Sequence, residues 1–230
     1  MIAAKAPKVG GRVRFREDNY YFYVGKNPNA DQVFAGKAYR GTPDITSENI
    51  DPLWANVPAL LLDKVRLLDT SKAPAGYTPP TAEYKLMWDD RYLYALAKVN
   101  SAYPLNHDNP NVWEQDSVEF FVDGDNSKSE SIDGMDRHII VTYQNVAKNF
   151  DARDLNGVVS SARVIEGGYI VQIKIPLDQP PKLGDIIGFD GQFNTTAGTS
   201  SRVSIVGWSG SQNLSDQKAS VWGEIELVNP

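Results

Sequence analysis

Tyr84-Lys-Leu-Met-Trp88, Asp89-Asp-Arg91 and Tyr92-Leu-Tyr-Ala-Leu-Ala-Lys-Val99 follow one another in the chain and decide its fold class. In the first segment Tyr84, Leu86 and Trp88 share one face, because successive side chains of a strand point to opposite faces. The short polar segment between the two apolar ones is typical of a hairpin turn. The stretch therefore predicts two antiparallel strands.

A second hairpin is predicted where Ala162–Glu166 and Tyr169–Pro176 flank two glycines, since glycine readily takes the positive φ of a tight turn. Alternation places four apolar side chains on its core face: Tyr169, Val171, Ile173 and Ile175. Further strands are predicted at Ser117–Val122, His138–Tyr143, Ile187–Asn194, Arg202–Trp208 and Val221–Val228. This spacing predicts an all-β fold, an antiparallel two-sheet β-sandwich of jelly-roll type.

The sandwich is expected to occupy residues 37–230. Residues 1–36 are expected to form an N-terminal extension or an added hairpin, with strands at Arg12–Arg16 and Tyr20–Val24. The stretch from Asp69 to Thr81 contains three prolines and is predicted to be a surface loop between two core strands.

Composition excludes several classes of protein. The net charge of −6 and the pI near 5.0 argue against nucleic acid as a partner, because a phosphate backbone is bound by clustered Lys and Arg. No apolar run approaches the roughly 20 residues of a membrane-spanning helix, so no membrane partner is expected. The absence of cysteine excludes disulfides, thiolate zinc sites and a cysteine nucleophile. The N-terminal residues lack the order of an export signal and indicate an internal domain edge.

No catalytic residue is predicted. The two histidines, His107 and His138, lie too far apart for a metal-ligand motif. The segment Gly207-Trp-Ser-Gly210 misses the Gly-x-Ser-x-Gly pattern of a nucleophile elbow by one position and is interpreted as a turn. With 29 acidic residues, composition alone leaves paired carboxylates and glycoside hydrolysis open as an alternative.

One acidic loop suggests a structural calcium ion. Asp123 and Asp125 stand close together, and Asn126, Glu130, Asp133 and Asp136 follow them. These side chains offer the oxygen ligands that calcium prefers, so Asp123 and Asp125 are predicted metal ligands. A solvated acidic turn is the alternative interpretation.

The segment Asn111-Val-Trp-Glu-Gln-Asp-Ser-Val-Glu-Phe-Phe-Val-Asp123 resembles the signature of family 9 carbohydrate-binding modules, found mainly at the C-terminal side of bacterial xylanases. Shorter matches follow the chain from about residue 38 to 228, including Gly41-Thr-Pro43, Trp88-Asp-Asp90 and Gly188-Phe189. The resemblance implies a non-catalytic β-sandwich that binds the ends of xylan and cellulose chains and short oligosaccharides. It further implies a covalently linked catalytic domain and an extracellular location.

The resemblance also implies site residues. Trp113 matches the first of two tryptophans that hold a sugar ring, and Glu119 matches a carboxylate that accepts from hydroxyls. Asp116 is either a ligand contact or a loop brace. Gln192 and Asn213 match two amides. The physical reason for this set is that an indole fits the apolar C–H face of a pyranose, while planar polar groups satisfy its hydroxyls.

Two positions depart from the family pattern. The family arginine falls near Ile140, and alternation puts His138, not Arg137, on the face of Ile140, so His138 joins the predicted site. The second tryptophan falls at Asp216, which cannot stack on a sugar. Trp222, Trp208 or Phe150 is the candidate to replace it. Trp54, Trp88 and Trp208 are predicted core residues because they lie in strand patterns, whereas Trp113 follows a polar loop.

The departures leave alternatives open. The domain is alternatively a sibling module that has lost sugar binding and serves as a spacer or interaction surface. A third alternative is a sandwich domain that binds haem through Met87 and His138.

Overall fold

The computed structural model describes residues 12–14, 21–23 and 35–230. Strands β1 (Arg12–Arg14) and β2 (Tyr21–Tyr23) pair in antiparallel fashion. They fall within the two strands predicted for this segment, whose remaining residues lie outside the described ones. The predicted division of the chain at residue 36 stays a prediction.

From residue 35 on, strands and three short 3-10 helices account for the regular structure that is described. The strands are β3 (Ala35–Arg40), β4 (Leu60–Leu62), β5 (Lys64–Leu68), β6 (Thr81–Trp88), β7 (Tyr92–Asn100), β8 (Ser117–Asp123), β9 (Asp136–Thr142), β10 (Ala147–Asn149), β11 (Val159–Ile165), β12 (Gly168–Pro176), β13 (Ile186–Thr195), β14 (Ser204–Gly207) and β15 (Gly223–Val228). The helices are η1 (Pro52–Asn56), η2 (Val112–Glu114) and η3 (Ala219–Val221). None of the helices in the described ranges is long and apolar enough to cross a bilayer.

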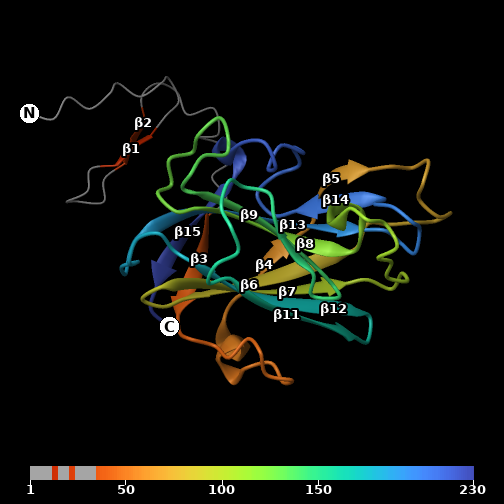
Figure 1. Ribbon diagram of the computed structural model, residues 1–230, viewed down its shortest axis with the longest axis horizontal. Coiled ribbons are helices and arrows are strands. Elements are labelled where there is room, and N and C mark those ends of the chain that lie inside the picture. The colour runs from red at the N-terminus through yellow and green to blue at the C-terminus, as the bar shows by residue number, and fades with distance from the viewer. Residues whose placement is uncertain (1–11, 15–20, 24–34) are drawn as a thin grey trace, which may run out of the picture.

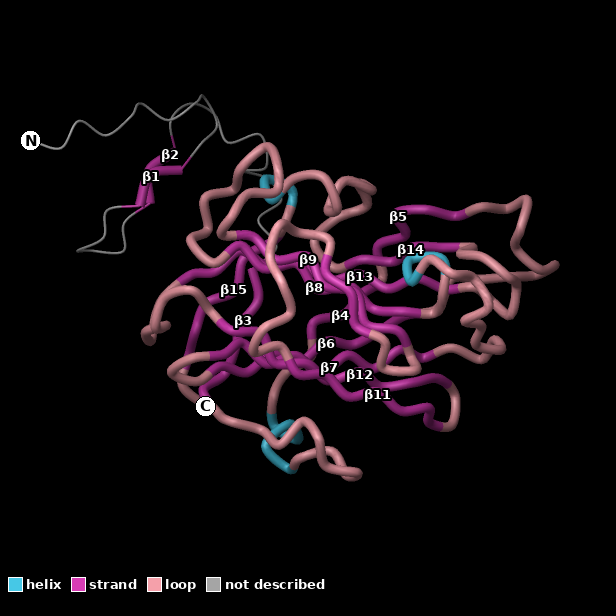
Figure 2. The backbone as a smooth tube through the Cα atoms, viewed as in Figure 1, coloured by secondary structure: helices cyan, strands magenta, loops and turns pink. Residues whose placement is uncertain are grey.

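The strands form two layers, which confirms the predicted β-sandwich. Their order is β10-β9-β8-β13-β15-β3-β6-β7-β12-β11, with β14 and β5 added beside β13 and with β4 beside β6. In Figure 1, β8, β9 and β13 lie in one layer and β6, β7, β11 and β12 in the other, with β3 and β15 at one side. The 3-10 helices lie in the loops outside the strands (Figure 2).

Both predicted hairpins are confirmed. β6 pairs with β7, and Tyr84 and Trp88 are fully buried on the core face. β11 pairs with β12 across a turn in which Gly167 has φ +75°. A Cβ on Gly168 would lie 1.9 Å from the Val99 carbonyl oxygen, so only glycine fits at the start of β12.

The core lies between the layers. Tyr84 of β6 packs on Phe120 of β8 with 5.4 Å between ring centroids. The Tyr84 hydroxyl donates to the Gln192 carbonyl of β13 at 2.9 Å, so this side chain of one layer contacts two strands of the other. The four predicted core side chains of β12, Tyr169, Val171, Ile173 and Ile175, are all fully buried. Complete burial of such side chains stabilises each by about 1.5–3 kcal/mol.

The structure departs from the predicted strands at three places. β3 pairs in parallel with both β15 and β6, which joins the two layers into one continuous sheet. β3, β4, β5 and β10 were not predicted. Trp54 is buried as expected, but on η1 instead of a strand, because Asp51 caps the Leu53 amide and Pro52 begins the helix.

Candidate functional site

A pocket of about 400 Å³ opens on the outer face of the β8–β9–β13–β14 layer, within the range typical of small-ligand sites. Its lining includes five of the six predicted sugar-contact residues. The lining residues are Trp113, Glu119, His138, Ile140, Phe150, Gln192, Arg202, Ile205, Asn213 and Asp216.

Strand register assembles the floor of this pocket. Ile140 of β9, Glu119 of β8 and Gln192 of β13 stand directly opposite one another on three neighbouring strands. Residues paired across a ladder point to the same face, so all three face away from the Tyr84–Phe120 core. All three are nevertheless buried, because loops rise around the sheet here.

Glu119 is held by two hydrogen bonds inside the protein. Its Oε2 lies 2.7 Å from His138 Nε2, and its Oε1 accepts from Asn194 Nδ2 at 2.7 Å. Burial raises the pKa of Glu119, but the hydrogen bonds and the charge of His138 outweigh burial and lower it below the ordinary value. Glu119 therefore stays an ionised acceptor.

Arg66 of β5 orients Gln192 from beside the floor, where it lies over Gly207 of β14. Its Nη1 donates to Gln192 Oε1 at 2.8 Å and to the Ser215 hydroxyl at 2.9 Å, and its Nη2 bonds Asp190 at 2.7 Å. The Arg66 and Asp190 side chains are about 1% exposed or less. Because Gln192 Oε1 is bound to Arg66, the amide of Gln192 is fixed in one orientation.

Aromatic rings form one side of the pocket. Trp113 is half-buried on η2, and Phe150, which follows β10, is 40% exposed. Their ring centroids are 5.4 Å apart with an interplanar angle of 81°, an edge-to-face contact. His138 stacks between Phe150 and Phe121, with centroids 5.4 and 4.3 Å away. Trp113 thus presents a supported ring to the pocket.

Of the three rings considered as replacements for the second tryptophan, Phe150 alone lines the pocket. Trp208 is buried, and Trp222 packs beside the pocket on the same outer face, against Phe121 at 5.4 Å. Asp216 is exposed at the pocket, as is Asn213. The side opposite the aromatic rings is therefore polar.

Arg202 places a guanidinium in the pocket that Ile140 also lines. It precedes β14, its Nη1 donates to Asn194 Oδ1 at 3.1 Å, and its backbone amide donates to Glu114 at 3.0 Å. Arg137, by contrast, points to the other face of β9 and bonds Asp151. From the sequence, Arg202 was predicted only as the first residue of a strand. Its position directly after the polar residues 199–201 is the sequence signal that could have indicated a place at the pocket.

Asp116 lies outside the pocket and braces the loop that carries Trp113. It is 1% exposed, and its Oδ2 accepts from the Asn106 amide at 2.8 Å and from the Thr196 hydroxyl at 2.5 Å. Burial raises the pKa of Asp116 despite these bonds. Of its two predicted roles, the structure supports the loop brace.

The haem alternative finds no support in the geometry. Met87 belongs to β6 and packs in the Trp54–Tyr94 cluster, whereas His138 lies on β9 in the other layer and binds Glu119. An iron ion needs both ligands within bond distance, and these two side chains do not converge.

The acidic loop contains buried polar atoms that lack partners. Asp123 and Asp136 pair across β8 and β9 and are fully buried. Four buried side-chain atoms have no hydrogen-bond partner among the described residues. They are Asn126 Nδ2, Asn126 Oδ1, Ser127 Oγ and Asp136 Oδ1. Buried polar atoms without partners are uncommon and call for a bound ion or water.

The carboxylates of this loop are also crowded, and this raises the pKa values of two of them. Burial, followed by the Asp125 side chain, raises the pKa of Asp123 to about 8. Burial and the charge of Asp133 outweigh the opposing hydrogen bonds and raise the pKa of Asp136 to about 7. In the described part of the chain no three acidic or histidine groups already meet with metal-ligand spacing, so a cation here also needs amide or hydroxyl oxygens. Asn126 and Ser127 supply them.

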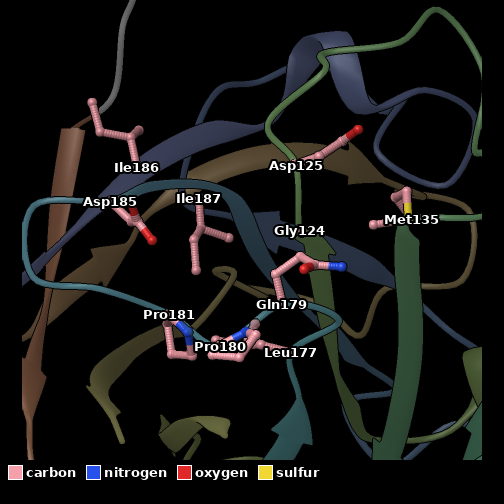
Figure 3. Close-up of a pocket in the computed structure, with 10 residues that line it drawn as sticks. All are labelled: Gly124, Asp125, Met135, Leu177, Gln179, Pro180, Pro181, Asp185, Ile186 and Ile187. Carbon is pink, nitrogen blue, oxygen red and sulfur yellow. The ribbon is translucent and has the colours of Figure 1, made fainter. Parts of the chain in front are cut away.

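A separate cavity of about 390 Å³ lies beside this loop (Figure 3). Pro180, Pro181 and Ile187 form its apolar part, and the Asp125 carboxylate points away from them in this view. None of the predicted sugar-contact residues lines it.

Together the fold and the pocket define a class of protein: a β-sandwich binding module with an aromatic and polar pocket on one face. The family model described as "Carbohydrate family 9 binding domain-like" matches residues 46–230. The chain belongs to this family of carbohydrate-binding modules.

Relatives and solved structures agree with the assignment. The chain is 36% identical over 192 residues to an endo-1,4-beta-xylanase A from Thermoanaerobacterium saccharolyticum, covering 83% of this chain and 16% of that protein. It is 37% identical over 213 residues to exoglucanase XynX from Acetivibrio thermocellus, covering 92% of this chain and 19% of that protein. The chain thus spans under a fifth of these relatives.

Structures of a family 9 module from Caldicellulosiruptor kristjanssonii, in complex with cellotriose and with glucose, superpose with TM-scores of 0.76 at 30% identity. Each covers 85% of this chain, and the matched parts are 94% and 96% of those chains.

Proposed function

We propose that the chain binds pyranose units of plant cell-wall polysaccharide in the Trp113 pocket, without catalysis. Xylan and cellulose chain ends and short oligosaccharides are the ligands. The observation that carries the proposal is a half-exposed indole at the edge of a row of buried hydrogen-bonding groups, Glu119 and Gln192. In this role Trp113 stacks on a C–H face of the ring and the row binds its hydroxyls.

We further propose that the module is part of a secreted enzyme and is linked covalently to a xylanase domain. The relatives named above are a xylanase and an exoglucanase. Tethering raises the effective concentration of enzyme at its polymer without any chemistry in the module.

Titration calorimetry with glucose, xylose, cellobiose and xylobiose tests the binding. Heat of binding with at least one sugar is expected, with no release of reducing sugar from xylan. Flat traces with all four sugars at millimolar protein would contradict the proposal and favour the spacer alternative.

Replacing Arg202 with alanine is expected to weaken sugar binding about 10-fold to 100-fold, because a hydrogen bond to a charged group contributes about 1.5–3 kcal/mol. Arg202→Lys should restore only part of the affinity, since lysine lacks the planar fork that also bonds Asn194. Calorimetry on both variants measures the effect. Equal affinity of the alanine variant and the parent would remove Arg202 from the site.

We also propose that the acidic loop binds a structural calcium ion, held by Asp123 and Asp125 together with the side-chain oxygens of Asn126 and Ser127. The partnerless buried atoms at Asn126, Ser127 and Asp136 support this proposal. When bound, calcium neutralises the crowded carboxylates and fixes the loop.

Millimolar calcium is expected to raise Tm by ~4–8 °C, equal to about 2 kcal/mol at a concentration well above Kd. Differential scanning calorimetry with calcium and with chelator measures the shift. Asp125→Asn should abolish it, whereas Asp90→Asn, at an exposed position in the β6–β7 turn, should retain it. The same Tm with calcium and chelator would contradict the proposal.

The metal-free protein should become less stable as pH rises. Asp123 and Asp136 have folded-state pKa values of about 8 and about 7, above their unfolded value of 3.8. A raised folded-state pKa contributes stability that is complete below pH 3.8 and is lost as pH rises through 7 and 8. In chelator, Tm should therefore fall as pH rises from about 4 to about 8, and Asp123→Asn should flatten the upper part of this profile.

A further inference from the structure

The two ends of the pocket differ in chemistry, and strand register shows which residues stand at each end. Along β13, Asn194 bonds Ser117, the first residue of β8 after η2 and Trp113, at 3.0 Å. Four residues away on the same strand, Asp190 bonds Ser215 at 2.7 Å. Gln192 lies midway. The indole contacts Phe150, which packs on His138 of β9, whereas Ser215 of the β14–β15 loop bonds Asp190 of β13 and Arg66 of β5. The indole and the β14–β15 loop therefore lie on opposite sides of the polar row across the sheet.

On the side opposite Trp113, no aromatic ring is among the described residues that line the pocket. Asn213 and Asp216 are the pocket-lining residues of the β14–β15 loop, and both are exposed. The nearby Trp222 is 3% exposed and donates its indole N–H to the Ser215 carbonyl at 2.9 Å. Its ring is therefore fixed against Phe121, beside the pocket and covered by the β14–β15 loop.

The second aromatic ring of the site cannot take that place either. The centroids of Trp113 and Phe150 are 5.4 Å apart at 81°, too close for a sugar ring to fit between them. Aromatic contact is thus confined to one face of a bound sugar. The other face meets a carboxylate and an amide.

This asymmetry has a chemical counterpart among pyranoses. In glucose and xylose all ring hydroxyls are equatorial, so both faces expose C–H groups. A sugar of galacto or manno configuration has one axial hydroxyl, at C4 or C2, so one face is apolar and the other carries a polar group. Only a sugar with an axial hydroxyl therefore presents an apolar face to the aromatic side of the pocket and a polar face to its other side.

Resting on the proposed function, we infer that the site selects pyranoses that carry an axial hydroxyl, with the apolar face on Trp113 and the axial hydroxyl toward Asp216 and Asn213. Gluco-configured and xylo-configured sugars still stack on Trp113. They gain nothing from Asp216, because they present C–H groups to a carboxylate that remains hydrated.

Calorimetry with the methyl β-glycosides of galactose, mannose and glucose tests the inference on the full chain. At least one axial glycoside should bind roughly 5-fold to 10-fold more tightly than the glucoside, as a charge-assisted hydrogen bond at an exposed position allows. Asp216→Ala should remove the preference, and Asp216→Trp should reverse it by giving the all-equatorial ring a second stacking partner. Asp90→Asn is the acidic control outside the pocket and should leave the ratio unchanged.

The outcomes separate this inference from the proposed function. A glucoside that binds as tightly as both axial glycosides, or a preference that survives Asp216→Ala, overturns the inference and leaves sugar binding intact. Failure of every glycoside, together with flat traces for cellobiose and xylobiose, overturns both.

Discussion

Replacing Trp113 with alanine should abolish measurable sugar binding, with a loss of about 2–4 kcal/mol, or roughly 30-fold to 1000-fold in affinity. The indole is the largest apolar surface that lines the pocket, and its edge-to-face contact with Phe150 fixes its orientation. Titration calorimetry with the tightest-binding sugar measures the loss.

Trp113→Phe is the matched variant and should keep part of the affinity, because phenylalanine retains a flat but smaller face. The fold should survive both changes, since Trp113 is only half-buried and the core lies on the other side of the layer. Unchanged Tm with lost binding is the expected pattern. An alanine variant that binds within about 3-fold of the parent would show that stacking is not the source of affinity.

Replacing Arg66 with methionine should destabilise the protein by about 3–5 kcal/mol, because the change leaves Asp190 as a buried charge without its partner. Gln192 Oε1 and the Gly210 carbonyl lose their donor at the same time. Urea unfolding measures the effect, and a chain of this size should lose ~6–20 °C in Tm.

A double variant separates charge from packing. Arg66→Met combined with Asp190→Leu removes both charges, so much of the lost stability should return. Sugar affinity should not return with it, because Gln192 is no longer oriented by the guanidinium. A single Arg66→Met variant within about 1 kcal/mol of the parent would show that water replaces the ion pair at no cost.

Sequence patterns predicted the parts of the fold in which neighbours along the chain act together. Both hairpins have alternating apolar residues and a polar or glycine turn, and the Tyr169 strand is buried as alternation predicted. By contrast, β5 was missed. Its alternation is weak, since Val65 and Leu68 are exposed while Arg66 is buried.

The site was predicted where it follows a motif and missed where it depends on distant contacts. Trp113, Glu119, Gln192 and Asn213 were placed from the resemblance and His138 from strand alternation, and all five line one pocket. The bond from Arg66 to Gln192 spans 126 positions of sequence, and no local pattern indicates such a contact. Arg202 was missed for the same reason, because a hydrogen bond to Asn194 on another strand holds its side chain at the pocket.

The parallel pairing of β3 with β15 sets where the described chain enters and leaves the sandwich. Ala35 pairs with Glu224 and Tyr39 with Val228, so the two strands run side by side in the same direction. The backbone therefore enters at one end of the pair and leaves at the other, roughly 15–20 Å away at the usual rise per residue. The Ala35 end and the Val228 end of the pair therefore lie at opposite ends of the same two strands.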